Sequence, residues 1–329
     1  MQPIHAQNKT QKINIKFTIS KNFKSQSAIK QNFFQRDLIK NQSAMEYLMT
    51  YGWAILIIAI VLVALFQMGV FNSANFAPKA QPGSCQVFRT TAATSLEGTC
   101  NNELPQYVAL FKGIVTSNVT SNIGNLPVGS SARTVAAWIN PASVSNYPSI
   151  VTWGDCGSYS WLSQLGISSS GTLEFAGTGH QFTQYQFVSS FIIPPKVWTF
   201  VAFSYASGSS SITLYSDQNS QSNSITGSLS TLSGTPFQIG SNNYDITQCY
   251  GDPFNGLISN VQVYNASLSA NDIKSLYYEG IGGAPQNTQN LVGWWPLNGN
   301  ANDYSGNNNN GAAANVVYTG SWAGGYSAP

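Results

Sequence analysis

The sequence predicts a mainly β protein, an antiparallel two-sheet jelly-roll sandwich preceded by one long hydrophobic α-helix. The first observation is an apolar run, residues 53–71, that contains no charged residue. The second is a series of short β-branched and aromatic runs, separated by Gly, Ser, Asn and Pro, which is typical of sandwiches. The third is an aromatic content of 12%, which is enough to fill a sizeable core.

The apolar run is long enough to cross a membrane as a helix of about 20 residues. Glu46 is the one charged residue between Lys40 and Lys79. Residues 1–41 carry eight Lys and Arg against one acid, Asp37. Because cationic flanks stay in the cytoplasm, the sequence predicts a single-pass protein of the cell membrane whose C-terminal part is extracellular.

The motif KNQSAME and the apolar helix behind it resemble the class III signal peptide of archaeal type IV pilin-like proteins. A secretory signal peptide has a shorter apolar core, followed by a small-residue cleavage site. The resemblance implies that a prepilin peptidase cuts between Asn41 and Gln42. That cut removes the basic leader 1–41 and leaves an assembly helix at 42–72, on which a filament, a homo-oligomer, is built.

Glu46 lies one helical turn after Gln42 on the same helix face. A carboxylate inside an apolar bundle is costly unless it is paired. The resemblance implies that Glu46 pairs with the N-terminal amine of Gln42 in a neighbouring subunit, which sets the stagger of the helices. The alternative is an uncut signal anchor, in which Glu46 lies among lipid headgroups.

The exported part is acidic. Without residues 1–41, six basic residues remain against eleven acidic ones. No basic patch is left to neutralise phosphates, so nucleic acid is excluded as a partner. Residues 73–84 mix Pro, Gly and small polar residues and are predicted to be a linker. The globular head then spans 85–329.

The head contains one predicted helix among its strands. Ser269 and Asp272 have the spacing of a capping box, and Gly280 is a stop signal, which predicts a short helix near 270–279. The runs predicted to be strands are RTVAAWI, SIVTW, TLEFA, WTFVAFSY, SITLYS, FQIG and GLISNVQVY.

The order and spacing of three stretches resemble landmarks of laminin-G-like, concanavalin A-like jelly rolls. The stretches are RTVAAWINP (133–141), WTFVAFSY with ITLYSD (198–217) and FNGLISNVQVYNASLSANDIKSLYYEG (254–280). Residues 291–311 resemble the segment that usually opens such a domain, although here it closes the chain. We expect 291–329 to be a permuted tail that docks Trp294, Trp295 and Leu297 on the same sandwich. The alternative is a truncated second repeat.

Four cysteines follow the apolar run, and an even number in an exported domain predicts two disulfides. Three connectivities exist. We favour Cys85 with Cys100, which closes a local loop, and Cys156 with Cys249, which ties two loops at one end of the sandwich. A thiolate metal site is disfavoured, because no CxxC spacing occurs.

Calcium is the one cofactor that the resemblance leaves open, because laminin-G-like domains often carry a site of carboxylate and carbonyl oxygens. Turn carboxylates more often cap backbone amides than bind ions. The candidates in turn-like sequence are Asp155, Asp217, Asp245, Asp252 and Asp303.

Two sequons mark candidate surface glycosylation sites, Asn118 in NVT and Asn265 in NAS. Such triplets fit surface loops of exported proteins. They also arise by chance.

The sequence predicts no enzyme. Sandwich glycosidases need two carboxylates held close together, whereas the run TLEFA carries only Glu174. His180 has no triad, and no GxSxG motif occurs.

We therefore expect a pilin-like structural subunit whose lectin-like head mediates adhesion by binding a carbohydrate or a surface protein. Tyr159, Trp161 and Tyr250 are aromatic candidates for stacking on sugars, although such residues more often fill cores. The alternative is a monomeric, membrane-anchored, lectin-like surface protein that never polymerises.

The first prediction concerns the N-terminal residue of the surface protein. Mass spectrometry of its terminal peptide should give a start at Gln42, because processing removes residues 1–41. A start at Met1 would identify an uncut anchor.

Overall fold

The computed structural model describes two compact units of the chain, Met1–Phe71 and Asn72–Pro329, and each is treated by itself. The described residues are 45, 47, 49–71, 76–101, 103–155, 161–178, 185–242 and 253–329.

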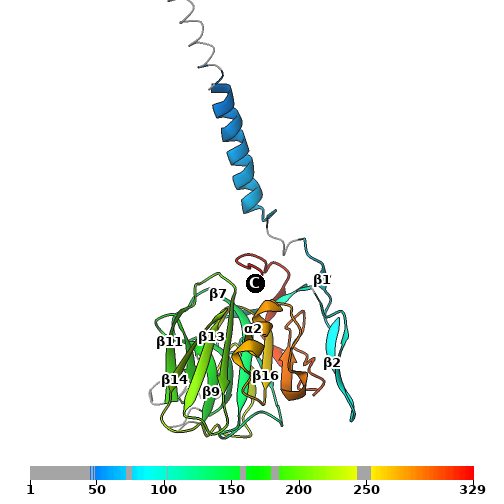
Figure 1. The fold of residues 1–329 in the computed structure, drawn as a ribbon, viewed down its shortest axis with the longest axis vertical. Helices are drawn as coiled ribbons and strands as arrows, with labels where there is room; N and C mark the ends of the chain where they lie inside the picture. The colour runs from blue at the N-terminus through cyan, green and yellow to red at the C-terminus, as the bar shows by residue number, and fades with distance from the viewer. Residues whose placement is uncertain are drawn as a thin grey trace, which may run out of the picture. The chain divides into compact units, whose positions relative to one another are not determined.

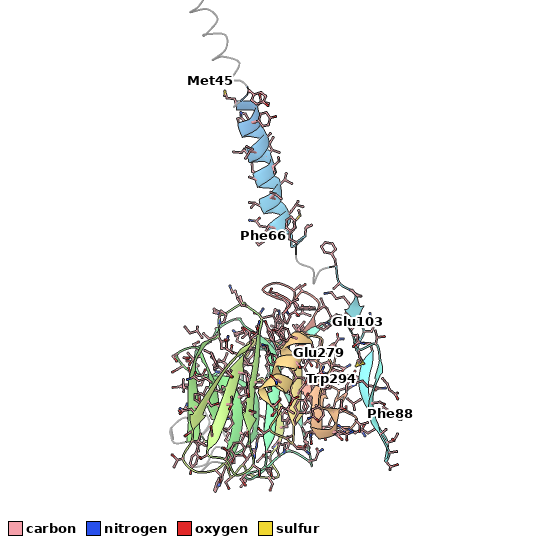
Figure 2. The ribbon with its side chains drawn as sticks, in the orientation of Figure 1. Met45, Phe66, Phe88, Glu103, Glu279 and Trp294 are labelled. Carbon is pink, nitrogen blue, oxygen red and sulfur yellow. A yellow bond between two sulfur atoms is a disulfide. The ribbon has the colours of Figure 1, made fainter. Side chains whose placement is uncertain are left out.

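The first unit contains an apolar helix, Met49–Gln67, that has the length and composition to cross a membrane. No residue of this helix is buried within the chain. Figure 2 shows its side chains projecting on all sides between Met45 and Phe66. The hydroxyl groups of Tyr47 and Tyr51 bond to one another at 3.0 Å near its N-terminal end. A helix that is apolar all round requires a membrane or other apolar helices as its surroundings.

The second unit is a sandwich of two mainly antiparallel sheets (Figure 1). The seven-stranded sheet has the order β11 (Gln186–Ile192), β10 (Thr172–Ala176), β9 (Leu162–Ile167), β8 (Ser149–Gly154), β15 (Phe237–Ile239), β6 (Asn118–Ser121) and β18 (Ala312–Ala314). The eight-stranded sheet has the order β14 (Asn219–Ser224), β13 (Ser211–Ser216), β12 (Thr199–Tyr205), β7 (Arg133–Pro141), β16 (Asn255–Tyr264), β5 (Val108–Lys112) and β19 (Val317–Thr319), with β17 (Leu291–Trp295) also paired to β16.

The main core lies between the two sheets, where alternate side chains of each strand meet. Phe175 of one sheet and Phe203 of the other have ring centroids 4.9 Å apart. Phe237 and Trp295 stack at 4.6 Å. Burying these aromatic rings supplies much of the stability of the sandwich.

A second core covers the outer face of the eight-stranded sheet. The helix α2 (Ala270–Tyr278) lies on this face and buries Ile273 and Leu276. Trp138 of β7 stacks with Tyr277 of this helix, with ring centroids 5.8 Å apart. Strand β7 is therefore buried on both faces, and all of its nine residues are buried. The capping box is confirmed: Ser269 accepts from the backbone of Asp272, and the Asp272 side chain accepts from Ser269.

The C-terminal tail contributes strands to both sheets of the sandwich. Strands β18 and β19 become edge strands of the two sheets, and β17 pairs with β16. Trp294, Trp295 and Leu297 are buried.

The stretch expected to be a linker, 73–84, contains a strand. In it β1 (Lys79–Ala80) pairs in parallel with β4 (Leu104–Pro105). The local composition of Pro and Gly gave no signal for this pairing, because the partner strand lies far along the chain.

The disulfide favoured from the sequence, Cys85–Cys100, is present. It closes the hairpin of β2 (Cys85–Arg89) and β3 (Thr94–Gly98). Arg89 at the end of β2 donates to the carbonyls of Ser305, Thr288 and Leu291, so the hairpin is fastened to the tail.

Asp303 organises the tail. Its Oδ1 accepts from the backbone of Trp294 and Ser305, and its Oδ2 accepts from the Ser305 hydroxyl and the Asn309 backbone, all at 2.8 to 2.9 Å. Hydrogen bonds to an ionised carboxylate are stronger than those between neutral groups.

We predict that Asp303→Ala lowers the free energy of unfolding by about 3 kcal/mol, because four buried donors lose one acceptor. Asp272→Ala, which removes only half of the capping box, should cost about 1 kcal/mol. Urea unfolding of the two variants would measure both values. Equal losses would show that Asp303 has no special role in docking the tail.

Candidate functional site

Most of the site residues predicted from sequence lie outside the described residues. These are Asn41, Gln42, Glu46, Cys156, Cys249, Asp245, Asp252, His180, Tyr159 and Tyr250. The pairing of Cys156 with Cys249 therefore stays a prediction. Trp161 is described and is partly buried.

Two of the described calcium candidates, Asp303 and Asp217, accept hydrogen bonds from protein groups. Both carboxylate oxygens of Asp303 accept hydrogen bonds from protein groups. Asp217 accepts from the backbone of Phe200 at 3.0 Å, and burial raises the pKa of its carboxyl group. Among the described residues, no three His, Cys, Asp or Glu side chains gather as a metal site would need.

The two sequons differ in accessibility. Asn265 is exposed after the end of β16. Asn118 is only 6% exposed in β6, where its amide donates to the carbonyl of Val115 at 3.0 Å. The expectation of a surface site at Asn118 is therefore wrong, because a tail strand, β18, pairs with β6.

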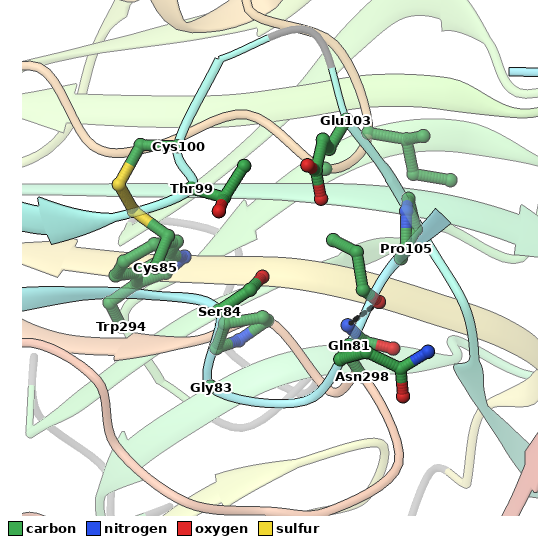
Figure 3. Close-up of a pocket in the computed structure, with 14 residues that line it drawn as sticks. Gln81, Gly83, Ser84, Cys85, Thr99, Cys100, Glu103, Pro105, Trp294 and Asn298 are labelled. Atoms are coloured by element: carbon green, nitrogen blue, oxygen red, sulfur yellow. Dashed lines mark hydrogen bonds between the residues drawn. A yellow bond between two sulfur atoms is a disulfide. The ribbon is translucent and has the colours of Figure 1, made fainter. Parts of the chain in front are cut away.

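One pocket lies beside the Cys85–Cys100 disulfide, between the hairpin and the tail (Figure 3). Glu103, Trp294 and Asn298 are among its lining residues. Its volume of about 30 Å³ has room for a water molecule or two, not for a sugar. Asn298 bonds to Tyr107 and Ala80 there, so the polar groups of this pocket hold the fold together.

A second cavity of about 70 Å³ is lined by Trp153, Leu126 and Thr235 at one end of the sandwich. Arg133 lies 5.8 Å from the Trp153 ring centroid and is fully buried. Burial lowers the pKa of Arg133 to about 10. Its guanidinium donates to the carbonyls of Ser131 and Gly129 and to the hydroxyl of Thr231, so it ties two loops together.

The most distinctive polar feature is a row of side chains across the outer face of the seven-stranded sheet. The cross-strand partners are in continuous register from one strand to the next. The row consists of Thr120 on β6, Gln238 on β15, Thr152 on β8, Gln164 on β9, Ala176 on β10 and Gln186 on β11. Their chain neighbours point into the core, so these residues point outward.

The row is almost free of charge. Glu174 on β10 is the one charged residue in the seven strands. It lies beside the row, and its Oε1 accepts from the amide of Gln186 at 2.6 Å. Gln164 accepts from Asn242 at 3.2 Å. We call this set, the row together with Glu174, the polar row.

The two ends of the polar row are the accessible parts. Gln164 and Glu174 at its centre are each 2% exposed, whereas Thr120 and Gln186 at its ends are half-buried. Val188, next to Gln186 on the same face of β11, is 45% exposed. A ligand in solution therefore reaches the row first at the β11 edge.

Sequence reasoning missed the polar row. A signal was present, because LSQLGI, QFVSSFI and FQI each place one Gln among apolar strand residues. What the sequence did not show is that the three strands lie in one sheet with these residues in register.

These features define the head as a concanavalin A-like β-sandwich. Residues 113–274 match the family model described as the concanavalin A-like lectin/glucanases superfamily. A comparison with curated proteins gave no match.

The chain is similar to several solved structures. A candidate carbohydrate-binding protein from Bacteroides ovatus is 18% identical, with a TM-score of 0.51 over 69% of this chain. This chain spans 62% of the length of that protein. A heptameric pentraxin from Limulus polyphemus is 14% identical, with a TM-score of 0.46 over 64% of this chain and 94% of its own. A sialidase carbohydrate-binding module from Ruminococcus gnavus, solved with sialyllactose, is 14% identical, with a TM-score of 0.39 over 50% of this chain and 96% of its own.

Proposed function

We propose that this chain is a cell-surface subunit whose sandwich head binds neutral glycans and whose apolar helix holds it in a membrane or a pilin-like filament. The observation that carries the glycan proposal is the polar row. Amides and hydroxyls in register across a sheet match the hydroxyl groups of a sugar, which both donate and accept hydrogen bonds.

The near absence of charge in the polar row favours a neutral ligand. Glu174 is the one charged residue of the seven strands, and it would repel the carboxylate of an acidic sugar. The accessible group at the β11 end of the row is the amide of Gln186, which can both donate to and accept from a sugar hydroxyl. Binding of a neutral glycan should also depend little on salt.

A binding role fits the carboxylates better than a hydrolytic one. Glycosidases place two carboxyl groups roughly 5 to 10 Å apart across the scissile bond. The described strands of the seven-stranded sheet offer Glu174 alone, held by Gln186. One carboxylate cannot supply both the acid and the base.

The apolar helix supports the surface location. None of its side chains is buried within the chain from Met49 to Gln67, and water would solvate them poorly. In the pilin-like role, the processed helix also packs against the helices of other copies of this chain. That part rests on the motif around Gln42 and Glu46.

We predict that Gln186→Ala weakens glycan binding about fivefold, because one hydrogen-bonding amide is lost at the accessible end of the polar row. Binding of the full chain in lipid nanodiscs to immobilised neutral polysaccharides would measure the change. Ser222→Ala, a change at an exposed polar position of the opposite sheet, should leave binding as it is. If the unchanged protein and both variants bind equally well, the polar row is not the glycan-binding site.

We predict that Glu46→Ala abolishes filaments while the protein still enters the membrane, because the carboxylate pairs subunits but does not aid insertion. Electron microscopy of cells, together with the amount of protein in the membrane fraction, would measure both effects. Glu46→Gln keeps the size of the side chain without its charge and should also lose filaments. Filaments of normal number in both variants would favour the monomeric anchor.

A further inference from the structure

The exposed face of α2 presents an aromatic side chain that the fold does not need for its core. Ile273 and Leu276 are buried on the inner face of the helix. Tyr278 at its C-terminal end is 52% exposed. Lys274, one turn earlier, places its ammonium 5.8 Å from the Tyr278 ring centroid. Half of a large ring thus remains open to solvent on the outer side of the eight-stranded sheet.

Tyr278 is held in place on two sides. Its hydroxyl donates to Oε1 of Gln218 at 3.1 Å, which fastens the helix to the turn between β13 and β14. Its ring contacts Tyr277, with centroids 5.3 Å apart, and Tyr277 is stacked on buried Trp138. A ring that is already fixed loses little conformational freedom when a ligand stacks on it.

Polar groups surround the exposed ring. Gln218 is exposed, its amide oxygen accepts from Tyr278, and its side chain also bonds to the Tyr277 hydroxyl. An amide nitrogen carries two hydrogens, so one donor remains for a ligand. Asp217 adopts a φ of 50°, and its Oδ1 accepts from the backbone of Phe200. Burial raises the pKa of the Tyr277 hydroxyl, and the charge of Asp217, the chain neighbour of Gln218, raises it further. Lys274 and Asp217 carry opposite charges, so the surface has no strong preference for an ion.

We propose that Tyr278, Gln218 and Asp217 form a second saccharide-binding surface, which stacks one neutral pyranose ring on Tyr278. The apolar face of a sugar ring packs on the aromatic ring, while its hydroxyls bond to the Gln218 amide and the Asp217 carboxylate. The surface lies on the eight-stranded sheet, and the polar row lies on the other. Two sites on opposite faces would let one head engage two glycan chains, with the gain in avidity that bivalence gives.

The test uses the full chain in lipid nanodiscs carrying Gln186→Ala, so that binding at the polar row is weakened. Saturation-transfer NMR with maltotriose, cellotriose and chitotriose reports contact with the sugar rings. In this background we expect binding to at least one trisaccharide. Adding Tyr278→Ala should weaken it roughly tenfold, because the stacking surface is lost.

Tyr278→Phe is the matched control. It keeps the ring and removes only the bond to Gln218, so binding should stay within about twofold of the parent. If Tyr278 had a purely structural role, Tyr278→Ala and Tyr278→Phe would instead change the temperature of thermal unfolding and leave binding unchanged. No contact with any trisaccharide in the Gln186→Ala background, or equal binding by Tyr278→Ala, would overturn the proposal. Loss of binding by Gln186→Ala alone would leave the polar row as the glycan site and would likewise overturn it.

Discussion

The head depends on two adjacent tryptophans that lie on opposite faces of one sheet. Trp295 of β17 belongs to the core between the sheets, and Trp294 belongs to the core beneath α2. Successive side chains of a strand point to opposite faces, so one short strand fills both cores. The indole of Trp294 donates to Asn260, and that of Trp295 donates to the carbonyl of Asn309. The tail that carries them is therefore integral to the sandwich.

The outer faces of the two sheets differ in polarity. The eight-stranded sheet packs a second apolar core on the outer face of its central strands, where α2 and the tail cover it, because strands buried on both faces need a second layer. The seven-stranded sheet carries the polar row on its outer face instead. The outer face of the eight-stranded sheet thus holds a second apolar core, with Tyr278 exposed at its margin, whereas the polar row is accessible only at its ends.

The helix and the head follow different physical rules. The helix is apolar on every side and uncharged from Met49 to Gln67, so its stability outside water comes from lipid or from other helices. The head is rich in neutral hydrogen-bonding groups and is closed by its own tail. In the proposed function, the helix provides the attachment and the head provides the glycan-binding surface.

The sequence by itself determined the local elements. Strand β7 covers the same residues, 133–141, as the run RTVAAWINP, and the capping box fixed the start of α2, because alternation and capping are short-range signals. The close pair Cys85 and Cys100 was predictable for the same reason. Only the tertiary structure decided that Asn118 is buried, that β1 interrupts the expected linker, and that Gln238, Thr152 and Gln164 lie in register. These facts depend on pairing between strands far apart in the chain, which no local pattern of residues encodes.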